Sequence, residues 1–252
     1  MPVVRFIGRA VPTVLNMTIG PMPSGIWPIP EIGLDIEFKC FIRHGVIHVE
    51  CSTNRYTPED FVHLLKVATD ISQLTLDLIA FRSGFPTVAV LETFINEHGV
   101  PDPIINSNPQ LTSIATALSL TDNNEFQNVF KILAEDWRAM CTLRDLIRAI
   151  SSHHEAPINH GRTIEGIRNL MAPTLGRNQA WEVVRNNLNV ADSYLRFITD
   201  KAIAPRHGDR GYLDGTTTGE LATRTWTIMN RYIEFRKRGD KQLPKNEFPI
   251  LS

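Results

Sequence analysis

The chain has 252 residues, 42% of them hydrophobic and 21% charged, which is typical of a globular protein with one large or two small domains. The formal net charge of -1 excludes a global field that would attract nucleic acid or a membrane surface. Three cysteines are too few for a disulfide framework. No apolar run approaches the roughly 18 residues of a membrane span, and the first residues lack a signal-peptide core. The composition therefore predicts a cytoplasmic protein without membrane contact.

The sequence changes character near residue 100. Before it, β-branched and aromatic residues alternate with polar ones, and after it the apolar residues follow helical spacing. Residues 99–110 carry three prolines and no periodicity, so we expect a linker there. The predicted fold class is α+β: a small antiparallel sheet with one long helix in residues 1–100, followed by an all-α bundle in residues 111–240.

Charge is also divided between the two parts. Residues 1–100 carry 7 basic and 10 acidic side chains, whereas residues 101–252 carry 19 and 17. Of the 19 basic residues in the second part, 14 are arginine. Arginine suits bidentate contacts to phosphate, although surface ion pairs explain the same bias.

The clearest local prediction is a β-hairpin over residues 34–53, with a turn at His44-Gly45. A glycine there supplies the positive φ of a tight turn. Pairing residue 43 with residue 46 places Ile42, Cys40 and Phe38 on one apolar face. The same register puts Lys39 opposite Glu50 on the other face and keeps the two cysteines of the hairpin, Cys40 and Cys51, too far apart for a disulfide.

A long helix is predicted after the hairpin. Thr57 is the expected N-cap, with Pro58 in the first turn and Asp60 completing a capping box, and Gly84 ends the helix. Further strands are expected over residues 3–11 and 86–95. The predicted buried stripe of the helix consists of Phe61, Leu64, Leu65, Ala68, Ile71, Leu74, Leu78 and Phe81.

One alternative for the first part is a metal-dependent nuclease. Asp35, Glu37 and Lys39 share a strand face and spell Asp-x-Glu-x-Lys, a pattern in which carboxylates hold a metal ion and a lysine steadies the attacking water. The competing interpretation is a solvated strand face with a Lys39–Glu50 ion pair.

Four helices are predicted in the second part, over residues 122–151, 162–171, 179–202 and 217–238. The first and last begin with capping boxes, Asp122 with Glu125 and Thr217 with Glu220. The expected core positions of the first helix are Phe126, Val129, Phe130, Leu133, Trp137, Met140, Leu143, Ile147 and Ile150.

Residues 204–215 place arginine, histidine and aspartate among glycines in a loop that leads to a helix N-terminus. Such a loop is a common position for functional groups, and a helix N-terminus favours an anion. A helical bundle with Arg206-His207 just before its last long helix resembles the HEPN domains of prokaryotic toxins and defence proteins. Many of these are metal-independent ribonucleases with an arginine four to six residues before a histidine, and two copies commonly pair.

The resemblance implies an RNA ligand, a homodimer, and His207 and Arg206 as catalytic residues, with Arg210 contacting nucleic acid. The chain departs from the signature because Arg206 is adjacent to His207 and Lys201 stands at the signature position of the arginine. The signature spacing instead occurs at Arg148 and His153, which we retain as a second catalytic pair, with Lys201 as a nucleic-acid contact.

No metal or cofactor is expected. His153, His154, Glu155 and His160 do not form a His-Glu-x-x-His motif, and the sequence contains no phosphate-binding loop or dinucleotide fingerprint. The predicted function is RNA cleavage or RNA binding in a bacterial defence or toxin system. The alternative is a non-catalytic scaffolding module that dimerises through the bundle.

Overall fold

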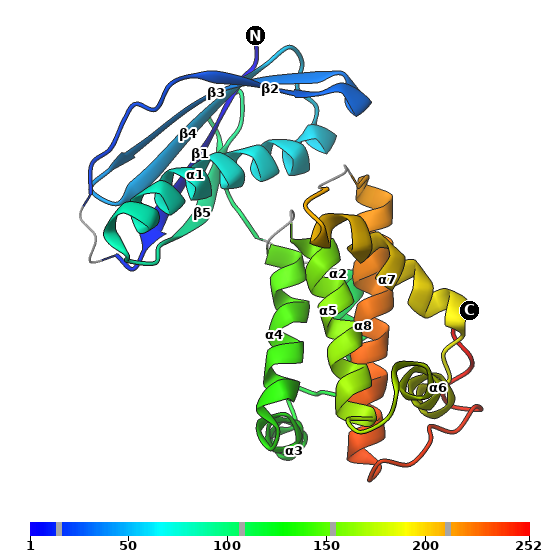
Figure 1. The fold of residues 1–252 in the computed structure, drawn as a ribbon. Coiled ribbons are helices and arrows are strands. Elements are labelled where there is room, and N and C mark those ends of the chain that lie inside the picture. The colour runs from blue at the N-terminus through cyan, green and yellow to red at the C-terminus, as the bar shows by residue number, and fades with distance from the viewer. Residues whose placement is uncertain (14–16, 106–108, 152–154, 210–212) are drawn as a thin grey trace. The chain divides into compact units, whose positions relative to one another are not determined.

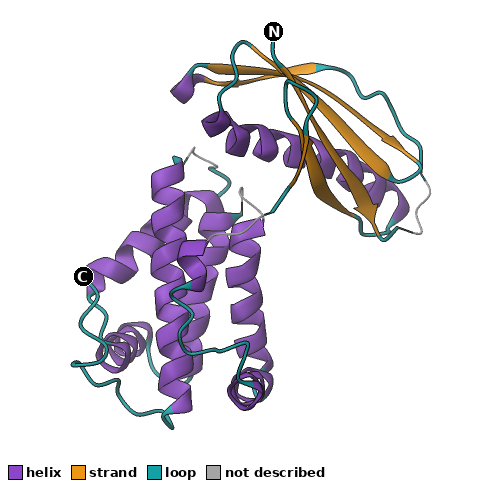
Figure 2. Ribbon diagram, turned by 180° about the vertical axis from the view of Figure 1, so that it is seen from behind, coloured by secondary structure: helices purple, strands orange, loops and turns teal. Residues whose placement is uncertain are grey.

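The computed structural model describes residues 1–13, 17–105, 109–151, 155–209 and 213–252 (Figure 1). The chain divides into two compact units, Met1–Ile105 and Asn106–Ser252, which we call unit 1 and unit 2. Strands lie in unit 1, and unit 2 is helical (Figure 2). The α+β fold class predicted from the sequence is therefore confirmed. None of the described helices is long and apolar enough to cross a membrane.

Unit 1 contains a six-stranded antiparallel sheet in the order β2-β3-β4-β1-β5-β6. One long helix, α1, covers one face of this sheet, and we call the opposite face the outer face (Figure 2). The bounds of the elements are β1 Val3–Val11, β2 Gly25–Ile29, β3 Leu34–Arg43, β4 Val46–Thr53, α1 Phe61–Ser83, β5 Val88–Ile95 and β6 Pro101–Pro103.

The predicted hairpin is confirmed residue by residue. Strands β3 and β4 pair from Ile36–Thr53 to Arg43–Val46, and His44 and Gly45 have φ of 51° and 77°. These positive angles belong to a two-residue turn whose twist matches that of the strands. Cys40 and Cys51 are buried free thiols, and burial raises the pKa of Cys51 to about 12.

Two strands were missed by the sequence analysis, and both lie at the edges of the sheet. Strand β2 contains Pro28 and only five residues, which gives almost no periodic signal. Strand β6 lies inside the segment 99–110 that we expected to be a linker. A proline at each end of β6 is compatible with an edge strand because one side of such a strand needs no hydrogen-bond donors.

Helix α1 ends as predicted, whereas the predicted N-cap Thr57 and its capping box open a short 3₁₀ turn, Pro58–Asp60, that leads into α1 at Phe61. Asp60 accepts a hydrogen bond of 2.8 Å from the Thr57 amide, and Gly84 ends the helix with φ of 70°. The predicted buried stripe is wrong in the second half of the helix, where Leu74, Leu78 and Phe81 are exposed. The buried positions there are Ser72, Thr75 and Leu76. The Ser72 and Thr75 hydroxyls each donate a hydrogen bond to a backbone carbonyl one turn earlier.

Unit 2 is a bundle in which α5 packs against α4, α6, α7 and α8. The helices are α2 Pro109–Thr112, α3 Asn123–Ala134, α4 Trp137–Ser151, α5 Ala156–Met171, α6 Arg177–Leu188, α7 Asp192–Arg206 and α8 Gly215–Lys237. A separate apolar core fills this unit, with Leu146, Ile164, Ile167, Leu188 and Ile228 among its buried members.

Two of the predicted helices are each divided in two. In place of one helix over residues 122–151, α3 ends at Ala134 and α4 begins at Trp137. The Asp136 carboxylate accepts a hydrogen bond from the Arg138 amide (2.9 Å), which caps the start of α4. The predicted core residues Phe126, Phe130, Trp137, Met140 and Ile147 are consequently exposed.

The predicted helix 179–202 is interrupted at Asn189, which adopts the left-handed conformation with φ of 52°. Its side-chain amide donates to the Leu243 and Phe248 carbonyls (2.8 and 3.0 Å), so the C-terminal segment holds this break in place. Helix α5 begins six residues before the predicted start at residue 162, and Asp214 rather than Thr217 caps α8.

Candidate functional site

The residues singled out from the sequence gather at one end of the bundle. Helix α4 ends there with Arg148 in its last turn, and α5 begins there (Figure 1). Helix α7 ends at the same place with Arg206, and α8 begins there after Asp214. We call this region the α7 end of the bundle. Two segments that are far apart in sequence, around residues 148 and 206, therefore lie at the same end of unit 2, each on a helix that packs against α5.

Arg206 is held by the neighbouring helix. Its Nη1 donates to Glu165 Oε1 at 2.8 Å, and the two side chains are 30% and 29% exposed. Gly161 on α5 leaves space for the guanidinium, because a Cβ there would lie 2.7 Å from Arg206 Nη2. The guanidinium is thus oriented by one carboxylate while part of it stays accessible to a ligand.

His207 caps the C-terminus of α7 and is exposed. Its amide donates to the Ala204 carbonyl (3.0 Å), and Gly208 follows with φ of 90°. In the part of the chain that the structure describes, no hydrogen bond or ion pair occupies the imidazole. An exposed histidine that directly follows a positioned arginine is a candidate general acid or base for a ligand that the arginine holds.

Two further cations lie at or near this end. Arg148 on α4 and Lys201 on α7 are both exposed, and neither forms an ion pair with another described residue. The two remaining predicted residues, His153 and Arg210, lie outside the described residues. Of the residues predicted from sequence, those that the structure describes thus provide an exposed imidazole, His207, and the basic side chains of Arg206, Arg148 and Lys201.

Sequence reasoning missed a polar group inside α5. Asn159 and His160 are almost completely buried, and Asn159 Nδ2 and His160 Nδ1 have no hydrogen-bond partner among the described residues. Burial lowers the pKa of His160 to about 4, so the imidazole is neutral at pH 7. Pro157 lies in the first turn of α5, where proline is tolerated. The helix predicted from residue 162 did not include His160.

The alternative metal sites have little support in the geometry. No group of three His, Cys, Asp or Glu side chains capable of holding a metal occurs among the described residues. His154, like His153, lies outside them. On strand β3, Lys39 Nζ lies 4.0 Å from Glu50, which also accepts a hydrogen bond from Arg5 (3.0 Å). Lys39 therefore takes part in a surface ion-pair group on the sheet.

Comparison with known proteins identifies both units. Residues 4–105 match the N-terminal domain, and residues 126–237 the C-terminal domain, of DUF8168, each described as a domain of unknown function. No curated protein and no solved structure matches the chain. The function must therefore be argued from the residues themselves.

Proposed function

The chain belongs to the DUF8168 family, and we propose that its helical unit is an HEPN-like module that binds and cleaves RNA without a metal ion. The observation that carries this proposal is that exposed His207 directly follows Arg206, whose guanidinium donates to Glu165 at 2.8 Å. The HEPN relationship is an inference from the bundle and from the Arg206-His207 sequence. The proposed setting is a defence or toxin system in the cytoplasm.

The chemistry follows from the two side chains. A neutral His207 imidazole takes the proton of a ribose 2′-hydroxyl, whose oxygen then forms a bond to the adjacent phosphorus. The bond from phosphorus to the 5′-oxygen breaks, and the imidazolium returns its proton to that leaving oxygen. Arg206 stabilises the negative charge that builds up on the phosphoryl oxygens. The products are a 2′,3′-cyclic phosphate and a 5′-hydroxyl.

Additional cations support the same function. Lys201 and Arg148 carry no ion pair with other described residues and can contact flanking phosphates. Pairing of two copies at this end would double the number of cations around one RNA strand, and a two-fold arrangement is the commonest form of self-association.

The test is cleavage of a single-stranded RNA by the full chain in the presence of EDTA. We expect His207→Ala to reduce the cleavage rate by at least 100-fold, which is the low end of what general acid–base catalysis contributes. The matched control is His98→Ala, because His98 is also exposed but lies in unit 1. Wild-type protein that leaves RNA intact across the pH range 5–9, or equal activity of both variants, would refute the proposal.

A second candidate function is scaffolding, and the exposed apolar residues of α3 and α4 favour it. Phe130 and Trp137 are 66% and 68% exposed, and Met140 and Ile147 lie on the same helix as Trp137. Single exposed apolar side chains are common, but several large ones together mark an interaction surface. If two copies pair through this surface, Trp137→Glu should convert a dimer to a monomer in light scattering while leaving the helical content unchanged.

A further inference from the structure

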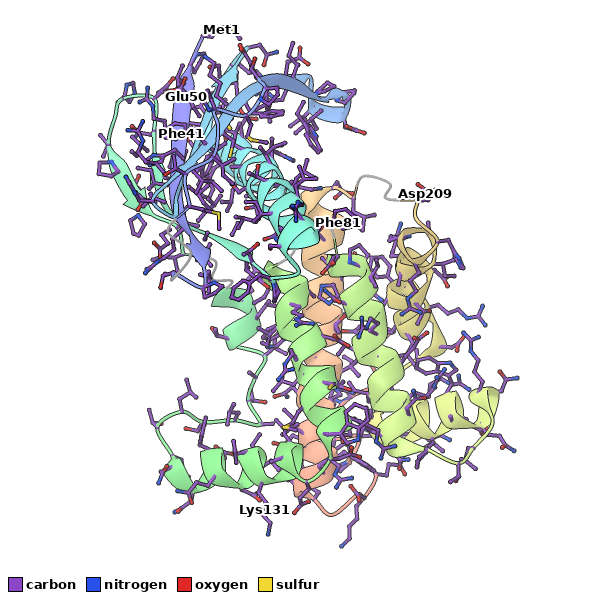
Figure 3. The ribbon with its side chains drawn as sticks, turned by 60° about the vertical axis from the view of Figure 1, so that its left-hand side comes forward. Met1, Phe41, Glu50, Phe81, Lys131 and Asp209 are labelled. Carbon is purple, nitrogen blue, oxygen red and sulfur yellow. The ribbon has the colours of Figure 1, made fainter. Side chains whose placement is uncertain are left out.

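The outer face of the sheet in unit 1 carries an aromatic stack between basic side chains. Phe41 on β3 and His48 on β4 are directly opposed, with ring centroids 4.6 Å apart and ring planes inclined by only 11°. Ile7 on β1 lies opposite His48 and continues the row. Figure 3 shows Phe41 and Glu50 on the face away from α1, whereas Phe81 lies on α1. No element of unit 1 packs over this row in the described residues.

Basic residues flank the row on both sides. Side chains two positions apart along a strand share a face, so Lys39 and Arg43 lie on either side of Phe41. By the same rule Arg5 and Arg9 lie on either side of Ile7 on β1, which puts four cations around the stack.

Within the described ranges, the acidic residues that pair with those four cations number only two. Glu50 is shared by Arg5 and Lys39, and Glu92 pairs with Arg9. Arg43 has no carboxylate partner among the described residues, and it lies close enough to His48 for its charge to affect the imidazole. The surroundings of the stack are therefore net positive, while Asp35 and Glu37 make the distant end of β3 acidic.

His48 is suited to stacking because its surroundings favour the uncharged imidazole. Burial, with a smaller effect from Arg43, lowers the pKa of His48 below its usual value. Because the two rings are stacked face to face, each ring leaves only its outer face for a further ring, and a nucleobase stacks on such an uncharged aromatic face.

From these observations we propose that the outer face of the sheet is a binding site for single-stranded nucleic acid. One base stacks on the Phe41–His48 pair, and Arg43 contacts the adjacent phosphate from one side of the row. Arg5 and Lys39, which share a single carboxylate, contact the backbone on the other side. RNA and single-stranded DNA share this chemistry.

The experiment measures binding of a fluorescein-labelled oligouridylate of twelve nucleotides to the full chain at low salt by fluorescence anisotropy. A 2′-O-methyl backbone prevents cleavage during the measurement, and oligothymidylate of the same length distinguishes RNA from DNA. We expect Phe41→Ala and Arg43→Ala each to weaken binding about tenfold, since stacking on an aromatic ring contributes 1–3 kcal/mol per base. Arg43→Ala should also reduce the slope of log Kd against the logarithm of salt concentration by about 0.7, because one phosphate contact is lost.

Matched control variants lie on the other side of unit 1. Phe81→Ala and Arg82→Ala remove the same residue types from exposed positions on α1, and they should bind as the wild type does. Melting curves of all four variants show whether a loss of binding reflects loss of folding, and Phe41→Leu keeps the apolar bulk without the aromatic face if Phe41→Ala unfolds.

The outcomes separate this site from the proposed ribonuclease site. Weakened binding by the Phe41 and Arg43 variants with normal binding by His207→Ala supports the sheet site, whether or not the protein cleaves RNA. Absence of oligonucleotide binding by the wild type refutes the sheet site. Equal binding by the Phe41 and Phe81 variants also refutes it. If oligonucleotide binding is then lost only in Lys201→Ala or Arg148→Ala, the binding site lies on the bundle instead.

Discussion

The buried imidazole of His160 links the stability of unit 2 to pH. Its pKa is lowered from 6.5 to about 4 by burial, so the folded protein favours the neutral form. The corresponding stabilisation is complete above pH 6.5 and is lost as the pH falls toward 4, because the unfolded chain then binds a proton that the folded chain does not. The total effect is about 3 kcal/mol at 1.4 kcal/mol per pKa unit.

We therefore predict that His160→Gln makes stability less dependent on pH. In urea unfolding, the free energy of unfolding of the wild type should fall between pH 7 and pH 4 by about 3 kcal/mol more than that of the variant. His98→Gln, which changes an exposed histidine, should follow the wild type. Parallel curves for wild type and His160→Gln would show that folding does not lower the pKa of His160.

The ion pair between Lys39 and Glu50 is predicted to contribute little. The Lys39 side chain is 57% exposed and its Nζ lies 4.0 Å from the carboxylate, which Arg5 engages more closely. Exposed pairs of this kind contribute about 0.2–1 kcal/mol. Lys39→Ala should thus shift the urea midpoint only slightly, and Glu50→Ala should cost more because it removes the partner of two cations. A larger cost for Lys39→Ala would contradict this ranking.

At the scale of elements, the contact between α5 and α7 depends on Gly161. A Cβ at this position would lie 2.5 Å from the Cβ of Ala202, and backbone-anchored atoms cannot move apart without shifting a helix. Glycine in a helix is normally less favourable than alanine by about 1 kcal/mol. The steric clash should outweigh this gain, since overpacking a core costs about 1–3 kcal/mol.

The prediction is that Gly161→Ala lowers the free energy of unfolding, whereas Gly219→Ala raises it. Gly219 lies in α8, and a Cβ there has no atom within 4 Å, so only the gain in helix propensity remains. Urea unfolding followed by circular dichroism measures both changes. Equal stabilisation by the two substitutions would mean that α5 and α7 are farther apart at Gly161 than described.

The elements that could be predicted from sequence are those whose signal is local. The register of the hairpin follows from the turn at His44-Gly45 and from alternation along both strands, so every pair was predicted correctly. The breaks at Asp136 and Asn189 depend on one capping carboxylate and on a side-chain amide that bonds a distant segment. Helical periodicity continues across both breaks, which explains why two helices were expected in place of four.

The candidate site was predictable only in part. Arg206 and His207 stand out because charged residues among glycines mark a loop before a helix. Glu165, which orients Arg206, lies 41 residues earlier and is indistinguishable in sequence from any other helical glutamate. The Phe41–His48 stack could be derived from the predicted register, which already opposes these two residues, but its aromatic character was not used.

At the scale of the whole molecule, two apolar cores lie in separate units. The buried core residues of unit 1 are confined to positions 4–94, and those of the second core to positions 117–243. Each core closes around its own secondary structure, the sheet with α1 in unit 1 and the bundle around α5 in unit 2. Since local opening follows cooperative units of this kind, a cavity made in one core should weaken that unit selectively.

This leads to a prediction for two matched substitutions, Leu34→Ala in unit 1 and Leu188→Ala in unit 2. Both leucines are fully buried, so each substitution should cost about 2–5 kcal/mol through lost burial and the remaining cavity. Hydrogen exchange read by mass spectrometry reports the two units separately because its peptides map to residues. Leu34→Ala should speed exchange in the strands of unit 1 and spare α5 and α8, and Leu188→Ala should do the reverse. If either substitution speeds exchange equally in both units, the two cores unfold as one cooperative body.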